Sequence, residues 1–232
     1  IDRNQKQLDI ASDRYKKHKE NKILCSDSIA ALDSVELDIV IEATGTPAAG
    51  ALVAKNVLNR GINLILLNVE TEATIGLALR KEAEKNNAIV TVADGDEPVA
   101  ALDLYNFAQE LSFEVISIGK GKNNPFNTFA TPSSLTKEAT LKQMNPKMLT
   151  SFVDGTKTMV EMTALANFLD FNIDIDGMHG IEATYENINQ HYIPKKDGGL
   201  LDETQVVDFA FGIAPGVFAV IYSEDDYVNY EM

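Results

Sequence analysis

Two lysines and two asparagines gather in one short stretch of the chain: Lys120, Lys122, Asn123 and Asn124. The stretch follows an apolar, strand-like run at residues 113–118. Ammonium and amide groups bind anionic and carbonyl oxygens, so we predict a rigid loop that grips such a ligand. The lysines would hold a phosphate or polarise a carbonyl, and the asparagines would orient it. The alternative interpretation is a solvated basic turn.

A lysine and a glutamate, Lys157 and Glu161, lie further along the chain, where residues 158–169 are predicted to form a helix. Lys157 and Glu161 are four residues apart and so share one helix face. The neighbours of Glu161 are apolar, and a carboxylate in such surroundings is costly unless it is paired. We therefore predict proton transfer by Glu161, helped by Asp154. An exposed salt bridge is the alternative.

Two further groups have open interpretations. His179 lies in a glycine-rich turn, where it would bind a substrate oxygen or act as an acid–base group; a structural turn histidine is the alternative. Asp94, Asp96 and Glu97 follow a predicted strand. They could ligate a divalent metal, but a helix N-cap and a first-turn acid explain two of them. We assign no metal.

The first half of the chain alternates helices and apolar strands. Helices are predicted over residues 5–19, 48–59, 75–87 and 98–111, and strands over residues 38–43, 63–68 and 88–93. This rhythm indicates a Rossmann-like α/β fold with a parallel sheet covered on both faces. Ligands of such sheets bind at the carboxyl ends of the strands. The candidate cofactor-binding residues there are Thr44, Gly45, Asn68 and Glu70.

The second half has fewer helices between its strands. Strands are predicted over residues 113–118, 172–175, 206–211 and 217–222, and helices over residues 135–149 and 158–169. This pattern favours an α+β catalytic domain with a mixed or antiparallel sheet. The predicted boundary near Ser112 gives an NAD(P)-binding domain, residues 1–112, and a substrate domain, residues 113–232.

Composition narrows the classes of partner. A net charge of −15 over 232 residues argues against nucleic acid or an anionic membrane as the partner. The single cysteine, Cys25, excludes an internal disulfide framework. No apolar run is long enough to span a bilayer. We expect a cytoplasmic homo-oligomer that acts on a small molecule.

The cofactor type stays open in the sequence. If the first residues end the second strand of a dinucleotide fold, Asp2 would bond a ribose, as in NAD binding, and Arg3 would accept a 2′-phosphate, as in NADP binding. The Gly-x-Gly-x-x-Gly turn that cradles the pyrophosphate does not occur in the chain. We therefore expect that turn upstream of residue 1.

Several motifs together resemble one family of enzymes. They lie at residues 40–47, 66–70, 95–98, 119–125, 154–162, 177–180 and 215–218. In these segments the chain resembles the homoserine-dehydrogenase-like oxidoreductases, and most of all the 1-deoxy-D-xylulose 5-phosphate reductoisomerase-like enzymes. The resemblance implies an NADP- or NAD-dependent oxidoreductase. It also implies an N-terminal glycine turn and a C-terminal SAF-type domain. Neither is found in this sequence, so a fragment is expected.

True homoserine dehydrogenases are less similar. They carry an Asp and then a Lys, four residues apart, where this chain has Lys157 and Glu161. They also carry Asn-Lys where this chain has Asn68-Val69. Homoserine dehydrogenase activity is thus an alternative to hydride transfer on a phosphorylated carbonyl or hydroxy compound. A ligand sensor without catalysis is an alternative of another class.

Overall fold

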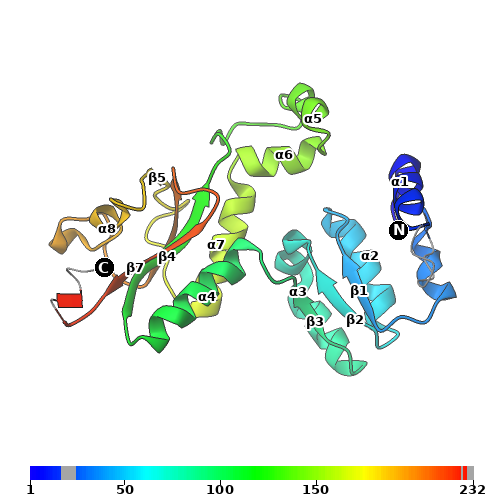
Figure 1. Cartoon of the computed structure of the whole chain (residues 1–232), viewed down its shortest axis with the longest axis horizontal. Helices are drawn as coiled ribbons and strands as arrows, with labels where there is room; N and C mark the ends of the chain where they lie inside the picture. Colours follow the sequence, from blue (N-terminus) through cyan, green and yellow to red (C-terminus); the bar gives the residue numbers. More distant parts are fainter. Residues whose placement is uncertain (17–24, 226, 229–232) are drawn as a thin grey trace. The chain divides into compact units, whose positions relative to one another are not determined.

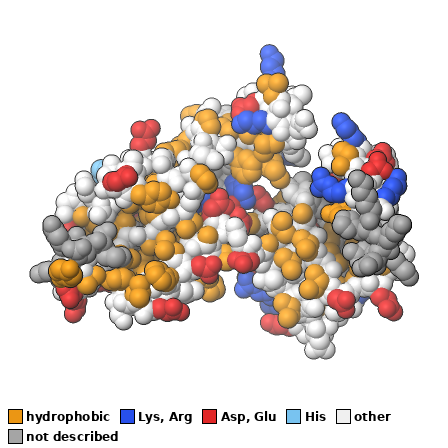
Figure 2. All heavy atoms as spheres, in the orientation of Figure 1, with side chains coloured by type: hydrophobic (Ala, Val, Ile, Leu, Met, Phe, Trp, Pro, Cys, Tyr) orange, Lys and Arg blue, Asp and Glu red, His pale blue; other side chains and the backbone are white. Residues whose placement is uncertain are grey.

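The structure is a computed structural model that describes residues 1–16, 25–225 and 227–228. The chain divides into two compact units, Ile1–Val92 and Ala93–Met232 (Figure 1). None of the helices within the described ranges is long and apolar enough to span a bilayer. Hydrophobic as well as acidic side chains are exposed on the face of both units shown in Figure 2.

The first unit is a three-stranded parallel sheet in the order β1-β2-β3. Its elements are α1 (Gln5–Tyr15), η1 (Ile29–Ser34), β1 (Ile39–Glu42), α2 (Pro47–Leu58), β2 (Asn63–Leu66), α3 (Val69–Lys85) and β3 (Val90–Val92). The helix predicted over residues 5–19 is described as far as residue 16, and its remainder lies outside the described residues. The predicted α/β class is confirmed.

Both crossover helices of the first unit pack on one face of its sheet. Leu64 and Leu66 of β2 are fully buried there against α2 and α3. On the other face Ile39 and Ile41 of β1 are 52% and 61% exposed. The prediction of a sheet covered on both faces is therefore wrong for the described residues. Successive right-handed crossovers that advance in one direction lay their helices on the same side.

The second unit is built on a mixed four-stranded sheet in the order β5-β6-β4-β7. Strands β4 and β6 are parallel, and β4 and β7 are antiparallel. The elements are α4 (Glu97–Glu110), β4 (Glu114–Lys122), α5 (Thr136–Lys142), α6 (Pro146–Val153), α7 (Thr156–Leu169), β5 (Ile181–Glu182), α8 (Ile188–His191), η2 (Lys195–Asp197), β6 (Val206–Phe211) and β7 (Val217–Tyr222). The predicted mixed sheet is confirmed.

The lysine-rich stretch is strand rather than loop. Strand β4 continues through Lys122, where the sequence analysis ended it at Ile118. The reason lies at two glycines. A Cβ on Gly119 would lie 1.8 Å from the Asp208 carbonyl oxygen, and one on Gly121 would lie 2.4 Å from the Ala214 nitrogen. Without side chains at these positions, the neighbouring backbone closes on β4 and buries its end.

The helix at residues 97–110 belongs to the second unit. Helix α4 packs on β4, β7 and α7, and its Ala101 and Ala108 join the core that includes Met162 and Leu165 of α7. The units therefore separate between Val92 and Ala93, and the boundary predicted near Ser112 lies too late in the chain. Charge and hydropathy along α4 do not reveal which sheet it covers.

Two further predictions differ from the structure. The single helix expected over residues 135–149 is two helices, α5 and α6, because Gln143 turns the chain with a left-handed φ of 54°. The strand expected over residues 172–175 is reduced to one bridge between Asn172 and Val206. Its place at the sheet edge is taken by β5.

Candidate active site

Lys120 and Glu161 form the centre of a buried charge network. The Lys120 Nζ lies 2.5 Å from Glu161 Oε2, and the Lys157 Nζ lies 2.7 Å from Glu161 Oε1. The Glu161 side chain is fully buried. The predicted pair of Lys157 and Glu161 therefore exists, and the alternative of a surface salt bridge is excluded by burial. What the sequence did not indicate is that β4 supplies a second cation from the opposite side.

The start of α4 adds two carboxyl groups to this network, from the N-cap residue Asp96 and from Glu97. Glu97 Oε1 lies 2.9 Å from the Lys120 Nζ. Burial opposes ionisation of Glu97, but hydrogen bonds from Asp96 and Lys120 outweigh it and lower its pKa to about 2. Burial, the hydrogen bond with Glu97 and the negative charge of Glu161 raise the pKa of Asp96 to about 6. One carboxyl of the network thus keeps its proton to near-neutral pH.

Lys122 differs from the other two lysines in its partners. Its ammonium donates to the Phe152 carbonyl oxygen at 2.5 Å and lies 5.9 Å from the centre of the Phe126 ring. Among the described residues it forms an ion pair with no carboxylate. Burial, and then the charge of Lys120, lower its pKa. Lys122 is thus a buried cation without an ion-paired carboxylate among the described residues, and the charge of Asp154 only partly offsets the lowering of its pKa.

These groups line a cleft within the second unit. A cavity of about 200 Å³ is lined by Glu97, Lys120, Gly121, Lys122, Asn123, Asn124, Phe152, Lys157, Thr158 and Glu161. Lys122 and both asparagines also border a wider cleft of about 630 Å³, whose wall includes Phe126 and Phe211. The predicted substrate-binding asparagines thus lie where the narrow cavity meets the wide one.

The cleft offers a defined chemistry. Ammonium groups polarise a carbonyl oxygen, and a buried carboxylate beside them exchanges a proton with it. The carboxylates of Asp96, Glu97 and Glu161 lie within 4.8 Å of one another, a spacing that also suits a cation. The Lys120 ammonium already pairs with two of them, so the cation at this place is a lysine. Asp94, the third acid that was considered as a metal ligand, is exposed and outside this group.

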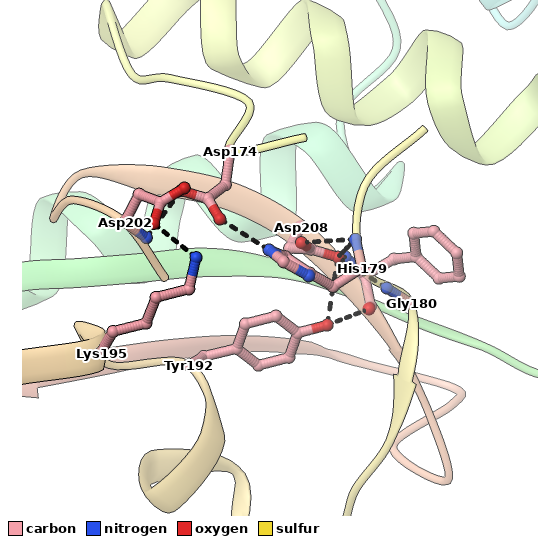
Figure 3. Close-up of polar contacts among 8 residues, drawn as sticks. Asp174, His179, Gly180, Tyr192, Lys195, Asp202 and Asp208 are labelled. Carbon is pink, nitrogen blue, oxygen red and sulfur yellow. Dashed lines mark hydrogen bonds and ion pairs between the residues drawn. The ribbon is translucent and has the colours of Figure 1, made fainter. Parts of the chain in front are cut away.

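Asp154 and His179 are not brought into the narrow cavity. Asp154 ends α6, and its Oδ1 accepts the Thr156 N–H at the start of α7 at 2.8 Å. His179 lines neither cleft. Its Nε2 lies 2.7 Å from Asp174 Oδ2, and its side chain points toward that carboxylate in Figure 3. For His179 the alternative of a structural turn histidine fits this geometry, and the catalytic role of Asp154 stays a prediction.

The turn that carries His179 is anchored to a fully buried carboxylate. Asp208 of β6 accepts N–H groups of His179 and Gly180 and the Tyr192 hydroxyl (Figure 3). Burial raises the pKa of Asp208, against the opposing effect of these hydrogen bonds. Asp208 pairs in register with Gly119, and side chains alternate along a strand. It therefore faces the side of the sheet opposite Lys120.

The first unit presents a separate polar edge at the carboxyl ends of its strands. Thr44 is exposed, and Gly45 has a left-handed φ of 70°. Thr46 precedes α2 without capping it through its side chain, so the first N–H groups of that helix have no side-chain acceptor from the N-cap. Asn68 caps α3, with Glu70 in its first turn. A glycine turn beside an uncapped helix start fits the phosphate or amide groups of a dinucleotide.

Asp2 and Arg3 do not lie at the end of a strand. Residues 1–4 precede α1 without forming a strand, and both side chains are exposed. Asp2 Oδ1 accepts the Asn4 N–H at 2.8 Å, and the Asp2 N–H donates to the Ser26 carbonyl oxygen. The condition under which these residues would contact a ribose, namely that they end a strand, is not met here.

Family models match nearly the whole chain. Residues 95–232 match the model described as "Oxidoreductase DRL, catalytic domain". The chain belongs to the DRL oxidoreductase family. Residues 2–93 match the model described as "Homoserine dehydrogenase, NAD binding domain". The chain therefore joins an NAD-binding domain of the homoserine dehydrogenase type to an oxidoreductase catalytic domain, and the two matched segments meet close to the boundary between its two units.

Comparisons with solved structures and with curated sequences do not identify the family further. A solved structure of aspartate dehydrogenase from Thermotoga maritima is 15% identical, with a TM-score of 0.28. The alignment covers 60% of this chain, and the chain spans 58% of that protein. No curated protein sequence matches the DRL oxidoreductase chain.

Proposed function

We propose that this DRL oxidoreductase transfers hydride between a nicotinamide cofactor and a small phosphorylated carbonyl or hydroxy compound. The substrate would be of the type used by 1-deoxy-D-xylulose 5-phosphate reductoisomerase-like enzymes. The observation that carries the proposal is Lys122: a buried ammonium with no carboxylate partner among the described residues, at the junction of two clefts. A buried cation is costly unless an anion pairs with it. A phosphate group would supply that charge.

The other residues have roles that follow from their contacts. Lys120 and Lys157 are already balanced by carboxylates, so they suit a neutral carbonyl better than a second anion. Asn123 and Asn124 border both clefts and offer amide donors and acceptors to a hydroxyl. Glu161 exchanges the proton of the reacting oxygen. When bound, the nicotinamide cofactor supplies or accepts the hydride.

Homoserine dehydrogenase activity is less well supported. The charges of Lys157 and Glu161 are reversed relative to that enzyme class. Lys122 does not separate the two alternatives, because the carboxylate of homoserine is also an anion. Assembly into a homo-oligomer and a cytoplasmic location are part of the proposal, and gel filtration with multi-angle scattering would test the first of them.

A substrate screen tests the proposal. Oxidation of NADPH and of NADH would be followed by absorbance with a panel of phosphorylated keto compounds and with their dephosphorylated counterparts. We expect turnover with a phosphorylated member and much weaker turnover without the phosphate. Turnover restricted to compounds without phosphate would contradict the proposal.

Substitution of Lys122 tests whether this residue binds the phosphate group of the substrate. Lys122→Ala should raise KM for the phosphorylated substrate by roughly 10- to 100-fold, the range for a lost hydrogen bond to a charged group. The affinity for the cofactor should not change. Lys142→Ala is the matched control, because Lys142 forms an exposed ion pair with Glu138 in the same unit. If Lys122→Ala and Lys142→Ala behave alike, the phosphate is held elsewhere.

A further inference from the structure

The turn at the edge of the first sheet rests on three buried polar side chains, of which the sequence analysis singled out Asn68 alone. Glu42, the last residue of β1, is 1% exposed, and Asn68 and Thr71 are equally buried. They lie directly beneath the turn formed by residues 44–46. A polar cluster in a small α/β core is costly, so its presence at this place calls for an explanation.

Each end of the turn is tied to one of these side chains. Glu42 Oε1 accepts the Thr44 N–H at 2.7 Å. Asn68 Nδ2 donates to the Thr46 carbonyl oxygen at 3.1 Å, while its Oδ1 accepts the Thr71 N–H and caps α3. One side chain thus fixes the start of the turn, and another fixes its end and also the helix that follows β2.

Burying these polar side chains beneath the turn costs free energy. Glu42 Oε2 and Thr71 Oγ1 are buried without a hydrogen-bond partner in the described structure, and an unsatisfied buried polar atom costs about 1–3 kcal/mol. Among the described residues, no lysine or arginine forms an ion pair with Glu42. An apolar side chain would avoid the cost but would leave the Thr44 N–H without an acceptor.

Gly50 of α2 makes room for the cluster. A Cβ there would lie 2.2 Å from Thr71 Oγ1, 3.0 Å from Glu42 Oε2 and 3.1 Å from Asn68 Nδ2. Three polar side chains from two strand ends and a helix therefore converge on one glycine. This convergence joins β1, α2 and α3 at the point where the turn emerges.

We propose that Glu42, together with Asn68, is a positioning residue for the nicotinamide cofactor: the two side chains hold the turn at residues 44–46 in its binding shape. The inference concerns the cofactor edge alone and does not depend on the proposed substrate. Neither side chain touches the cofactor, because both are buried beneath the turn.

Two substitutions of similar volume test the role of Glu42. Glu42→Gln keeps an oxygen that accepts the Thr44 N–H, whereas Glu42→Leu keeps the volume and removes the acceptor. In Glu42→Leu we expect faster hydrogen–deuterium exchange of the Thr44 amide, and affinity for NADPH or NADH reduced by roughly tenfold in calorimetric titration. Glu42→Gln should match the wild-type protein in both measurements.

Thermal unfolding separates positioning from simple structural support. Because an apolar side chain replaces an unpaired buried carboxylate, Glu42→Leu should unfold at the same or a higher temperature while it binds cofactor less well. Glu82→Leu is the control, since Glu82 lies near the far end of α3, away from the turn. It should leave the Thr44 exchange rate and the cofactor affinity unchanged.

Three outcomes would overturn the inference. They are an unchanged Thr44 exchange rate in Glu42→Leu, equal cofactor affinity in Glu42→Leu and the wild-type protein, and an equal loss of affinity in Glu42→Gln. If the wild-type protein binds neither cofactor, this edge is not the cofactor site and the inference also fails. The substrate proposal is judged separately, by the KM of Lys122→Ala.

Discussion

At the scale of single residues, Glu161 owes its chemistry to its two partners. One ammonium approaches each carboxylate oxygen, from Lys120 and from Lys157. Attraction between opposite charges holds the carboxylate and the two ammonium groups together, and the surrounding protein excludes water that would weaken the interaction. Glu161 therefore suits the role of acceptor for the proton of a substrate oxygen bound beside these lysines.

Removing the charge of Glu161 tests this role. Glu161→Gln should lower kcat and kcat/KM by a similar factor, about 10²–10⁴, because acid–base catalysis is lost. Adding Lys157→Met to that variant should have much less effect than Lys157→Met alone, since residues that act as a unit are not additive. Steady-state kinetics of the two single variants and the double variant give the comparison.

The exposed pair of Glu138 and Lys142 supplies the control for that experiment. It has the same spacing of four residues, but both side chains are exposed by more than two fifths. Glu138→Gln should leave rates unchanged and cost less than about 1 kcal/mol of stability. Full activity in Glu161→Gln would remove the proposed proton carrier.

Asp96 gives the site a pH dependence of known sign. Its pKa in the folded protein is raised from 3.8 to about 6. The unfolded chain loses this proton first as pH rises, so the contribution of Asp96 to stability is fully present below 3.8 and is lost as pH passes about 6. Asp96→Asn has no such proton to lose.

The measurement for Asp96 is urea unfolding of the wild-type protein and of Asp96→Asn at several pH values. The stability of the wild-type protein should fall relative to that of the variant between pH 3.8 and about 6, because the other carboxyl groups are common to both proteins. A difference that is independent of pH over this range would show that Asp96 has an ordinary pKa.

At the scale of elements, β4 decides what the lysines can do. A strand alternates its side chains, so Lys120 and Lys122 point to the same side of the sheet, toward α7 and the cleft. In a loop the same residues would be solvated and independent. Gly119 and Gly121 make the strand possible, because the neighbouring backbone leaves no space for side chains there.

A methyl group at Gly119 should therefore be costly. Gly119→Ala places a carbon against the Asp208 carbonyl in the centre of the sheet, and we expect a loss of at least about 1–3 kcal/mol of unfolding free energy. Urea denaturation measures it. Glu114→Ala, at the exposed start of the same strand, should change stability by less than about 0.5 kcal/mol. Equal stability of the two variants would mean that β4 ends before Gly119.

At the scale of the whole molecule, the two units carry different parts of the function. The NAD-binding match covers the first, and the catalytic match covers the second. All the charged groups of the candidate active site belong to residues 93–232, including Asp96 and Glu97 on α4. The catalytic unit is therefore complete only if it includes the segment that precedes β4.

Two fragments test this division. Residues 93–232 should fold cooperatively, whereas residues 113–232 should not, because the shorter fragment exposes the faces of β4, β7 and α7 that α4 covers. Circular dichroism during thermal unfolding distinguishes a cooperative transition from its absence. Equal cooperativity in both fragments would restore the boundary near Ser112.

Much of this protein was determined by local pattern in the sequence. Runs of apolar residues between turns fixed β1, β2 and β3, and the distance from Lys157 to Glu161 fixed their pairing, because four residues make about one helical turn. Such features depend on neighbours in the chain, so composition and spacing are enough to predict them.

Tertiary structure decided the rest. Lys120 meets Glu161 across 41 residues of chain, and Glu97 reaches Lys120 from a helix that local pattern assigned to the wrong unit. Burial placed the lysines, which were expected in a ligand-binding loop, at the end of a buried strand. Glu42 was unremarked in the sequence because its partner is a backbone N–H in a turn. Periodicity indicates which face of an element is buried, but the partner that meets this face depends on how distant segments pack.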